Sequence, residues 1–538
     1  MIAALRGMVM AMAIWGGAGP RAMAQDHGTR GTPLPQGETV TATLEAVPAH
    51  YVLAAPAGSY VEGIFAPETA AQELVLRLRQ GGQPVRQLVA AVSGQQRFRF
   101  LQPEAGDLQV SGAQGGAYSL TLTRIVPPAQ QHPPAPEWPS PIMGPIMSPI
   151  MGQIASQSGA LERLWPQIVA RGTPLVEETG AGLVVTFLYR GAQRNVRLLG
   201  GPSNDHDWLE RLGGTDLFYK SYRVARDTRL SYQLAVDVPD IPGPAQARRA
   251  ALLAVAQADP LNPHRLAPAA DAYMAYSVFD GPEAPAQAGF PAQALALEWQ
   301  VFGSGHLGNR RAIALYTTPD FTPQDPRAVL AVVLDGTEAA KGMHLPDALR
   351  QLAAAHRLPP MAVVFVDPID AARRAAEMPQ DPAFAAMLAD ELVPRIAAQI
   401  GLRPDPARTV LVGESFGGLA ALRVALERPD RFGAVIALSG SYWWAPEPRG
   451  RAASSWITQR LLQAPQMPRV FLGAGLFETA RGGDALAGDI WESNRQVASV
   501  LAARGGEVLW SPWSGGHDRY VWRGKITEGL IALFGLTG

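Results

Sequence analysis

The chain is constrained most strongly by residues 413–417, which read GESFG and fit the pattern G-x-S-x-G. The aliphatic run 409–412 precedes this segment, and the Ala- and Leu-rich run 418–427 follows it. This order predicts a buried strand, a sharp turn and a helix, which is the setting of a nucleophile elbow. Glycines allow the strained turn that lifts a serine hydroxyl above the sheet edge, and the helix start directs free N–H groups toward it. Ser415 is therefore a candidate nucleophile.

A serine hydroxyl becomes a good nucleophile only when a base accepts its proton. Of the nine histidines in the chain, only His517 follows Ser415, and it lies in the run SGGHD at 514–518. Hydrolases with this elbow order their catalytic residues as serine, acid, histidine. The alternative is a chance G-x-S-x-G match in a Gly- and Ala-rich chain, against which the strand, the helix and the single downstream histidine agree. We therefore expect His517 to be the base.

The third member of such a site is a carboxylate that fixes the histidine tautomer. Eight carboxylates lie between Ser415 and His517. Glu478 fits best because it follows the strand-like run 470–472 closely, whereas Asp484 and Asp489 come later in the same loop. A solvated loop carboxylate is the other interpretation of Glu478.

Composition excludes several classes of function. The 538 residues are 47% hydrophobic and 17% charged, as in a folded protein with more than one domain. The formal net charge of -1 gives no overall attraction to nucleic acid or to an anionic membrane. The chain has no cysteine, which excludes disulfides, thiolate metal sites and cysteine catalysis.

The N-terminus predicts export. Residues 1–24 combine an early positive charge, a short apolar stretch and an Ala-Met-Ala sequence at 22–24, as in a cleavable signal peptide. The alternatives are a membrane anchor or a disordered leader. No later segment supplies the roughly 18 uncharged apolar residues of a membrane span. We expect a periplasmic or secreted protein.

Composition along the chain predicts four further regions. Residues 25–126 contain short alternating strands, such as 117–125, and predict an accessory β-sandwich. Residues 127–153 are rich in proline, contain three Pro-Ile-Met units and predict an extended linker. Residues 154–300 predict a second sandwich, and residues 301–538 alternate strand and helix.

The last region predicts the catalytic domain. Apolar strands that alternate with helices indicate a mostly parallel sheet covered on both faces, which is the α/β-hydrolase arrangement. The expected strands are 311–316, 329–334, 362–366, 409–412, 434–438, 469–472 and 507–510. Helices are expected at 346–356 and 382–400, among others.

Several motifs, taken in order, resemble the enterochelin (ferric enterobactin) esterases over most of residues 170–538. In the catalytic region they are LDG at 334–336, VDPID at 366–370, RAAEM at 374–378, GESFGG at 413–418, SGSYWW at 439–444, GHD at 516–518 and WR at 522–523. In the preceding region they are VTF at 185–187, GTD at 214–216 and DPLNP at 259–263. Residues 35–150 lie outside this resemblance.

The resemblance implies hydrolysis of the serine trilactone esters of catecholate siderophores. It identifies Ser415 with the family's nucleophile, His517 with its base and Glu478 with the acid of a Gly-x-Arg-Glu segment. Phe477 stands in place of that arginine, and an insertion lengthens the loop before His517. The N–H groups of Phe416 and of a residue near Gly336 are the expected oxyanion donors.

A ferric tricatecholate is anionic and aromatic, so arginine and tryptophan side chains are candidate contacts. The candidates are Arg373, Arg374, Arg519 and Arg523, together with Trp443, Trp444 and Trp513. Solvated surface charges and core packing are the respective alternatives. Glu377 is expected to pair with Arg374. We find no metal-ligand spacing and expect no cofactor, so that iron would arrive with the substrate.

Two other functions remain compatible with these residues. One is a carboxylesterase that acts on feruloyl, acetyl or other simple esters. The other is a non-catalytic siderophore- or glycan-binding protein that keeps the fold.

Overall fold

The computed structural model describes residues 31–68, 73–131, 149–180, 182–203, 206–266, 270–446, 456–479 and 489–536. The predicted signal peptide (1–24) and most of the Pro-rich segment (132–148) lie outside these residues. Within them, no helix has both the length and the apolar content needed to cross a membrane.

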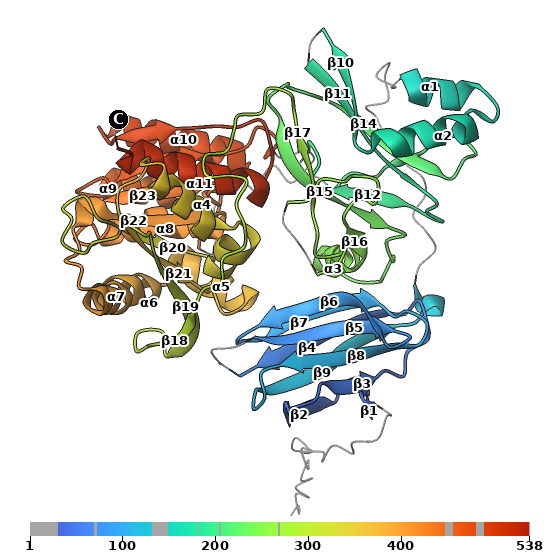
Figure 1. Cartoon of the computed structure of the whole chain (residues 1–538), viewed down its shortest axis with the longest axis horizontal. Coiled ribbons are helices and arrows are strands. Elements are labelled where there is room, and N and C mark those ends of the chain that lie inside the picture. The colour runs from blue at the N-terminus through green and yellow to red at the C-terminus, as the bar shows by residue number, and fades with distance from the viewer. Residues whose placement is uncertain are drawn as a thin grey trace, which may run out of the picture.

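An eight-stranded, mostly parallel sheet forms the centre of the C-terminal domain, as predicted (Figure 1). Its order is β18 (Trp299–Ser304), β19 (Asn309–Thr317), β21 (Met361–Val366), β20 (Val329–Val333), β22 (Thr409–Glu414), β23 (Ala434–Leu438), β24 (Arg469–Gly473) and β25 (Val508–Trp510). Strands β18, β19 and β21 pair antiparallel, and all pairs from β21 to β25 are parallel. The carboxyl ends of six strands therefore meet at one edge, where the expected site residues follow them.

Helices cover both faces of this sheet because its strands are apolar on both sides. Helices α4 (Leu345–Ala354) and α11 (Arg519–Phe534) contribute to the core on one face. The other face packs against α5 (Ala371–Gln380), α6 (Pro382–Ala386), α7 (Val393–Ile400), α8 (Phe416–Glu427), α9 (Trp456–Gln463) and α10 (Ile490–Ala503). The helix expected at 382–400 is interrupted by a π-helical turn, η3 (Met387–Leu392).

The N-terminal sandwich, residues 32–126, consists of two antiparallel sheets with one mixed edge. The first has the order β1 (Thr32–Pro33), β3 (Ala49–Val52), β8 (Gly106–Gly112), β5 (Leu74–Gln80) and β6 (Gln83–Ala91). The second is β2 (Thr39–Thr43), β9 (Ala117–Val126), β4 (Tyr60–Pro67) and β7 (Gln96–Leu101). The alternation seen in the sequence is real, since Tyr118, Leu120 and Leu122 of β9 are all buried.

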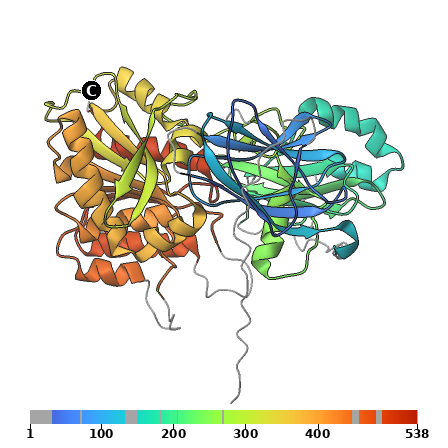
Figure 2. The same ribbon diagram turned by 90° about the horizontal axis from the view of Figure 1, so that it is seen from below.

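The second sandwich, residues 175–280, lies between the other two bodies in sequence. Its sheets are β10 (Leu175–Thr179), β11 (Gly182–Arg190), β14 (Leu217–Val224) and β13 (Glu210–Arg211), and β12 (Val196–Leu199), β15 (Arg229–Val236) and β16 (Ala256–Gln257), with β17 (Ser277–Asp280) paired to β15. Helix α3 (Ala245–Val255) leads into β16. Figure 2 shows both sandwiches on the same side of the catalytic domain.

The expectation of an extended chain through residue 153 is wrong for its last part. Residues 149–152 open helix α1 (Pro149–Ser156), which is followed by α2 (Ala160–Arg171). A proline fits the first turn of a helix, where its missing N–H has no partner to lose. Met151 is fully buried in a cluster with Ile154 and Leu161, so packing decides the conformation.

Candidate active site

Ser415 occupies the sharp turn between β22 and α8. Its backbone is at φ 58° and ψ -121°, a conformation that non-glycine residues rarely adopt. Its N–H donates to the carbonyl of Leu438 at the end of β23, at 3.0 Å. A side chain at Gly413 could not be accommodated, because its Cβ would lie 2.3 Å from the carbonyl oxygen of Gly417. Gly413 thus permits the close backbone approach that lifts Ser415 from the sheet.

His517 and Glu478 are in direct contact. His517 Nδ1 lies 2.8 Å from Glu478 Oε2, and the Glu478 side chain is fully buried. The other carboxylate oxygen, Oε1, accepts hydrogen bonds from Ser439 Oγ and from the N–H of Gly475, both at 2.7 Å. Trp522 donates to Ser439 Oγ at 2.9 Å and sets its ring edge against the imidazole, with centroids 4.6 Å apart. The carboxylate is therefore held rigidly on the histidine.

Leu438 and Ser439, two consecutive residues at the end of β23, connect Ser415 to the carboxylate that contacts His517. Ser415 is bonded to Leu438, and Ser439 is bonded to the carboxylate that holds His517. Ser415 Oγ lies 3.4 Å from Ser441 Oγ, and within the described residues no hydrogen bond joins it to the imidazole. Catalytic hydrogen bonds of free enzymes are often long and tighten when substrate binds.

The expected oxyanion donors lie at the ends of neighbouring strands. Phe416 is the first residue of α8, where a helix leaves its N–H groups without intrahelical partners. Gly336 follows β20, and a Cβ there would lie 2.3 Å from the backbone nitrogen of Val366. The preceding residue, Asp335, has φ 51° and accepts two hydrogen bonds from Arg374, at 2.7 and 2.6 Å. The backbone around Gly336 is thus fixed on both sides.

The four candidate arginines have different surroundings. Arg374 is committed to Asp335, and Arg519 pairs with Glu338 at 2.8 Å and stacks on Tyr276. Arg523 stacks on the rings of Phe290 and Tyr520 and donates to Gln287. Arg373, at the start of α5, is exposed. Of the four, Arg373 is the one whose residue is exposed, and it lies at the edge where the strands end.

The three candidate tryptophans also have different surroundings. The rings of Trp443 and Phe416 lie 6.2 Å apart, so Trp443 is next to the elbow. Trp444 packs edge-on against Trp456 and joins the core beneath α8 and α9. Trp513 is buried and donates to the carbonyl of Gly516, inside the loop that carries His517.

The expected pairing of Glu377 with Arg374 is wrong. Glu377 receives hydrogen bonds from Arg311, at 2.7 Å, and from Asn309, at 2.8 Å, and the side chains of Glu377 and Arg311 are buried. Of the alternative acids, Asp489 caps α10 by accepting the N–H of Glu492, at 3.2 Å. Residue 484 lies outside the described residues.

The sequence did not reveal that the second sandwich holds the histidine loop. Asp518, next to His517, is buried and accepts hydrogen bonds from the N–H and hydroxyl of Ser231 in β15 and from the N–H of Tyr520. The N–H of Arg229 donates to the carbonyl of Ser514 at 2.9 Å. The signal was present in the GHD motif, whose aspartate follows the base directly, but nothing in the sequence named its partner.

Glu414 precedes Ser415 and is buried beneath the elbow. Burial raises the pKa of Glu414 to about 8, and the nearby Asp335 carboxylate contributes in the same direction. Among the described residues, Glu414 Oε1 has no hydrogen-bond partner. Burial without a partner for this oxygen favours the protonated form of the side chain.

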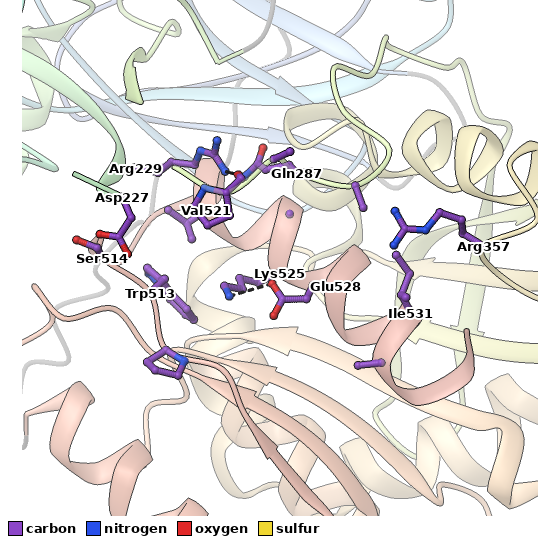
Figure 3. Close-up of a pocket in the computed structure, with 16 residues that line it drawn as sticks. Asp227, Arg229, Gln287, Arg357, Trp513, Ser514, Val521, Lys525, Glu528 and Ile531 are labelled. Atoms are coloured by element: carbon purple, nitrogen blue, oxygen red, sulfur yellow. Dashed lines mark hydrogen bonds and ion pairs between the residues drawn. The ribbon is translucent and has the colours of Figure 1, made fainter. Parts of the chain in front are cut away.

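A cavity of about 510 Å³ lies behind the histidine loop, between residues 227–229 and 285–288 and helix α11 (Figure 3). Trp513 and Ser514 form part of its wall, and Lys525 and Glu528, one turn apart on α11, pair at 2.9 Å in that wall. Neither Ser415 nor His517 lines it.

Comparison with known proteins identifies the family. Residues 304–533 match the family described as "Putative esterase", and residues 184–290 match "Enterochelin esterase, N-terminal". The iron(III) enterobactin esterase of Dickeya dadantii (strain 3937) is 33% identical over 428 residues, which cover 72% of this chain and 95% of that protein. This chain belongs to the enterochelin esterase family. It is accordingly an esterase with an α/β-hydrolase domain, as the motifs predicted.

Other members of the enterochelin esterase family agree in sequence and in fold. The iron(III) enterobactin esterase of Escherichia coli (strain K12) is 30% identical over 341 residues, covering 61% of this chain and 81% of that protein. The crystal structure of the enterobactin esterase from Shigella flexneri in the presence of enterobactin superposes with a TM-score of 0.56 at 29% identity, covering 70% of this chain and 99% of that one. The N-terminal sandwich, residues 32–126, lies outside both matched family ranges.

Proposed function

We propose that this protein hydrolyses the ester bonds of catecholate siderophore trilactones such as enterobactin, with Ser415 as nucleophile, His517 as base and Glu478 as acid. The observation that carries the proposal is the 2.8 Å contact between His517 and the buried Glu478, anchored to the same strand end as the serine elbow. The names of the relatives, which are iron(III) enterobactin esterases, support the substrate class.

Acylation begins with attack of Ser415 Oγ on the ester carbonyl carbon while His517 Nε2 accepts the hydroxyl proton. Glu478 keeps the proton of the imidazole on Nδ1 and stabilises the imidazolium. The tetrahedral intermediate collapses, the C–O bond to the leaving alcohol breaks, and His517 returns the proton to that alcohol. Water then repeats the sequence on the acyl-enzyme, which releases the carboxylic acid and restores Ser415.

The N–H groups of Phe416 and Gly336 would stabilise the oxyanion of each intermediate. Both groups belong to backbone that cannot move freely, one at a helix start and the other between two fixed residues. Such preorganised donors act where charge develops in the transition state. Loss of one donor of this kind costs about 10²–10³ in rate.

The ferric substrate would bring negative charge and aromatic rings to the strand-end edge. Arg373 is the exposed cation there, and Trp443 is the ring beside the elbow. We assign these two a substrate-binding role and assign Arg374, Arg519 and Arg523 a structural one, because their side chains are engaged within the protein. Iron enters as part of the substrate. We also propose export to the periplasm, on the evidence of residues 1–24 alone.

Replacement of the nucleophile tests the catalytic assignment. Ser415→Ala should lower kcat on enterobactin by about 10⁴–10⁶-fold, because the covalent route is lost. Ser441→Ala is the matched control: its hydroxyl lies 3.4 Å from that of Ser415, but it is not in the elbow. This control should keep most of the activity. Full activity in Ser415→Ala would refute the assignment.

A substrate panel tests the substrate assignment. Trilactones with and without iron should give a higher kcat/KM than p-nitrophenyl and feruloyl esters, with ring-opened products identified by mass spectrometry. A preference for the simple esters would make the protein a carboxylesterase of another class. A fluorophosphonate probe that fails to label Ser415 would instead indicate a non-catalytic binding protein.

A further inference from the structure

The N-terminal sandwich reaches the catalytic domain at the turn that follows β21. Gln96, the first residue of β7, donates from Nε2 to the carbonyl of Ile369 at 2.7 Å. The N–H of Gln95 donates to Asp370 Oδ2 at 3.3 Å. Gly94 lies so close that a Cβ there would be 2.7 Å from Cγ2 of Ile369. The contact is therefore tight, and it involves the backbone of the turn.

The turn adopts a backbone conformation that its sequence does not favour. Ile369 has φ 72°, which for a β-branched residue is an outlier. Such a conformation persists only where the surroundings fix it. Inside the catalytic domain, the N–H of Ile369 donates to Asp367 Oδ1 at 2.8 Å. The sandwich adds the hydrogen bond from Gln96 to the carbonyl of Ile369 and the close approach of Gly94.

One connection from this turn leads to the residue after Gly336. Asp367 holds the turn with one carboxylate oxygen, and with the other it accepts the hydroxyl of Thr337 at 2.5 Å. Burial raises the pKa of Asp367, while the hydrogen bond from Thr337 acts in the opposite direction. The same carboxylate thus links Ile369 to Thr337.

A second connection leads to the residue before Gly336. Asp370 caps α5 by accepting the N–H of Arg373 at 2.8 Å, which sets where the helix begins. Arg374, in the first turn of that helix, forms the bidentate pair with Asp335 and donates to the carbonyl of Glu414 at 3.3 Å. Both neighbours of Gly336 are therefore tied to the segment that the sandwich contacts.

We propose that Gln96 is a positioning residue for catalysis and that the N-terminal sandwich is part of the catalytic unit. Gln96 holds the turn at Ile369, and the turn orients the Gly336 amide through Asp335 and Thr337. This inference rests on the proposed role of Gly336 in the esterase reaction. An amide aimed at the oxyanion acts in the transition state, so loss of the contact lowers kcat and leaves KM almost unchanged.

The test is a pair of variants at one position. Gln96→Glu keeps the shape but places an acceptor against the carbonyls of Ser93 and Ile369, and Gln96→Ala removes the contact without repulsion. We expect kcat to fall about tenfold in Gln96→Ala and further in Gln96→Glu, since small misplacements of a catalytic group can cost up to about 10²-fold. The matched control is Gln83→Ala, at the exposed first residue of β6, and it should have wild-type kinetics.

Two substrates separate this inference from the proposed function. Both enterobactin and p-nitrophenyl acetate should lose the same factor in kcat, because the chemistry of the oxyanion is common to them. A wild type that cleaves only the simple ester would refute the siderophore assignment, and the variants would still test the positioning role on that ester. Thermal unfolding and circular dichroism confirm that each variant is folded.

Two results would overturn the inference. The first is wild-type kcat in both folded Gln96 variants. The second is a rise in KM for enterobactin alone, which would make the sandwich a wall of the substrate site without influence on the oxyanion. Gly336→Ala supplies the reference for a direct defect, because its Cβ would lie 2.3 Å from a backbone nitrogen.

Discussion

The two sides of the catalytic edge are supported by different bodies of the molecule. The histidine side, residues 514–520, is held by the second sandwich through Asp518, a buried carboxylate that accepts three hydrogen bonds. The oxyanion side, residues 335–337, is held through the turn at Ile369 by two donors of the N-terminal sandwich: Gln96 donates to the carbonyl of Ile369, and the N–H of Gln95 donates to the Asp370 carboxylate at 3.3 Å. Asp518 is buried and receives three donors, whereas the turn receives one hydrogen bond on a carbonyl and one long, exposed hydrogen bond on a carboxylate, so the first support is the stronger.

This difference separates what the family shares from what this chain adds. Most of the second sandwich falls within the matched range 184–290 of the enterochelin esterase N-terminal family, whereas the N-terminal sandwich lies outside it. The second sandwich supports the loop of His517, the proposed base, through Asp518. The N-terminal sandwich supports the proposed oxyanion donor at Gly336 through Gln96. Variants that remove each support, Asp518→Ala and Gln96→Ala, should therefore lower kcat by different factors.

Among the variants that test this comparison, the largest effect is expected at Glu478, the carboxylate in contact with His517. Glu478→Gln keeps the volume but removes the acceptor that fixes the Nδ1 proton of His517. We expect kcat to fall by about 10²–10⁴-fold, as when the tautomer is lost in a serine–histidine–acid site. Ser439→Ala, which removes one donor to the same carboxylate, should have a much smaller effect. Near wild-type kcat in Glu478→Gln would show that Ser415 and His517 suffice.

A smaller effect is expected from cutting the support on the histidine side. Asp518→Ala leaves the N–H and hydroxyl of Ser231 without their acceptor in a buried site. The cost of unpaired buried donors, about 1–3 kcal/mol each, should lower Tm, and the freed loop should lower kcat about 10–100-fold. Steady-state kinetics and thermal melts measure both. The comparison fails if this variant is no worse than Gln96→Ala.

Much of the fold was predictable because its signals are local. The strands β20 to β25 are short aliphatic runs, and the elbow at Ser415 is defined by glycines in a fixed pattern. Elimination also selected His517, as no other histidine follows the elbow. Glu478 was placed by its distance from a strand end, and it is the carboxylate that contacts the imidazole.

The supports were not predictable because they join residues that are far apart in the chain. Asp518 and Ser231 are 287 positions apart, and Gln96 and Ile369 are 273 apart. Periodicity and motifs describe one segment at a time and cannot pair such residues. The same limit explains the mistaken partner of Glu377: Arg374, three residues away, was expected, whereas the buried Arg311 of β19 takes the carboxylate.

The smallest effect concerns a second buried carboxylate, which contrasts with Asp518. Burial raises the pKa of both carboxyls, but Asp518 has three donors, whereas one oxygen of Glu414 has none among the described residues. Glu414 has a pKa of about 8 in the folded protein and an ordinary low value when unfolded. As pH rises between these values the unfolded chain releases a proton that the folded protein keeps, so stability falls.

Glu414→Gln should remove this dependence. Below the unfolded pKa both forms of Glu414 are protonated, and the variant should melt close to wild type. From there to about pH 8 the wild type should lose stability relative to the variant, so that the Tm difference widens by several degrees, at roughly 2–4 °C per kcal/mol. Glu492→Gln, an exposed carboxyl whose pKa Arg495 lowers, is the control and should show a constant difference above pH 6. A constant difference in Glu414→Gln as well would mean that Glu414 is ionised in the folded protein and that the cluster with Asp335 and Arg374 is held by charge.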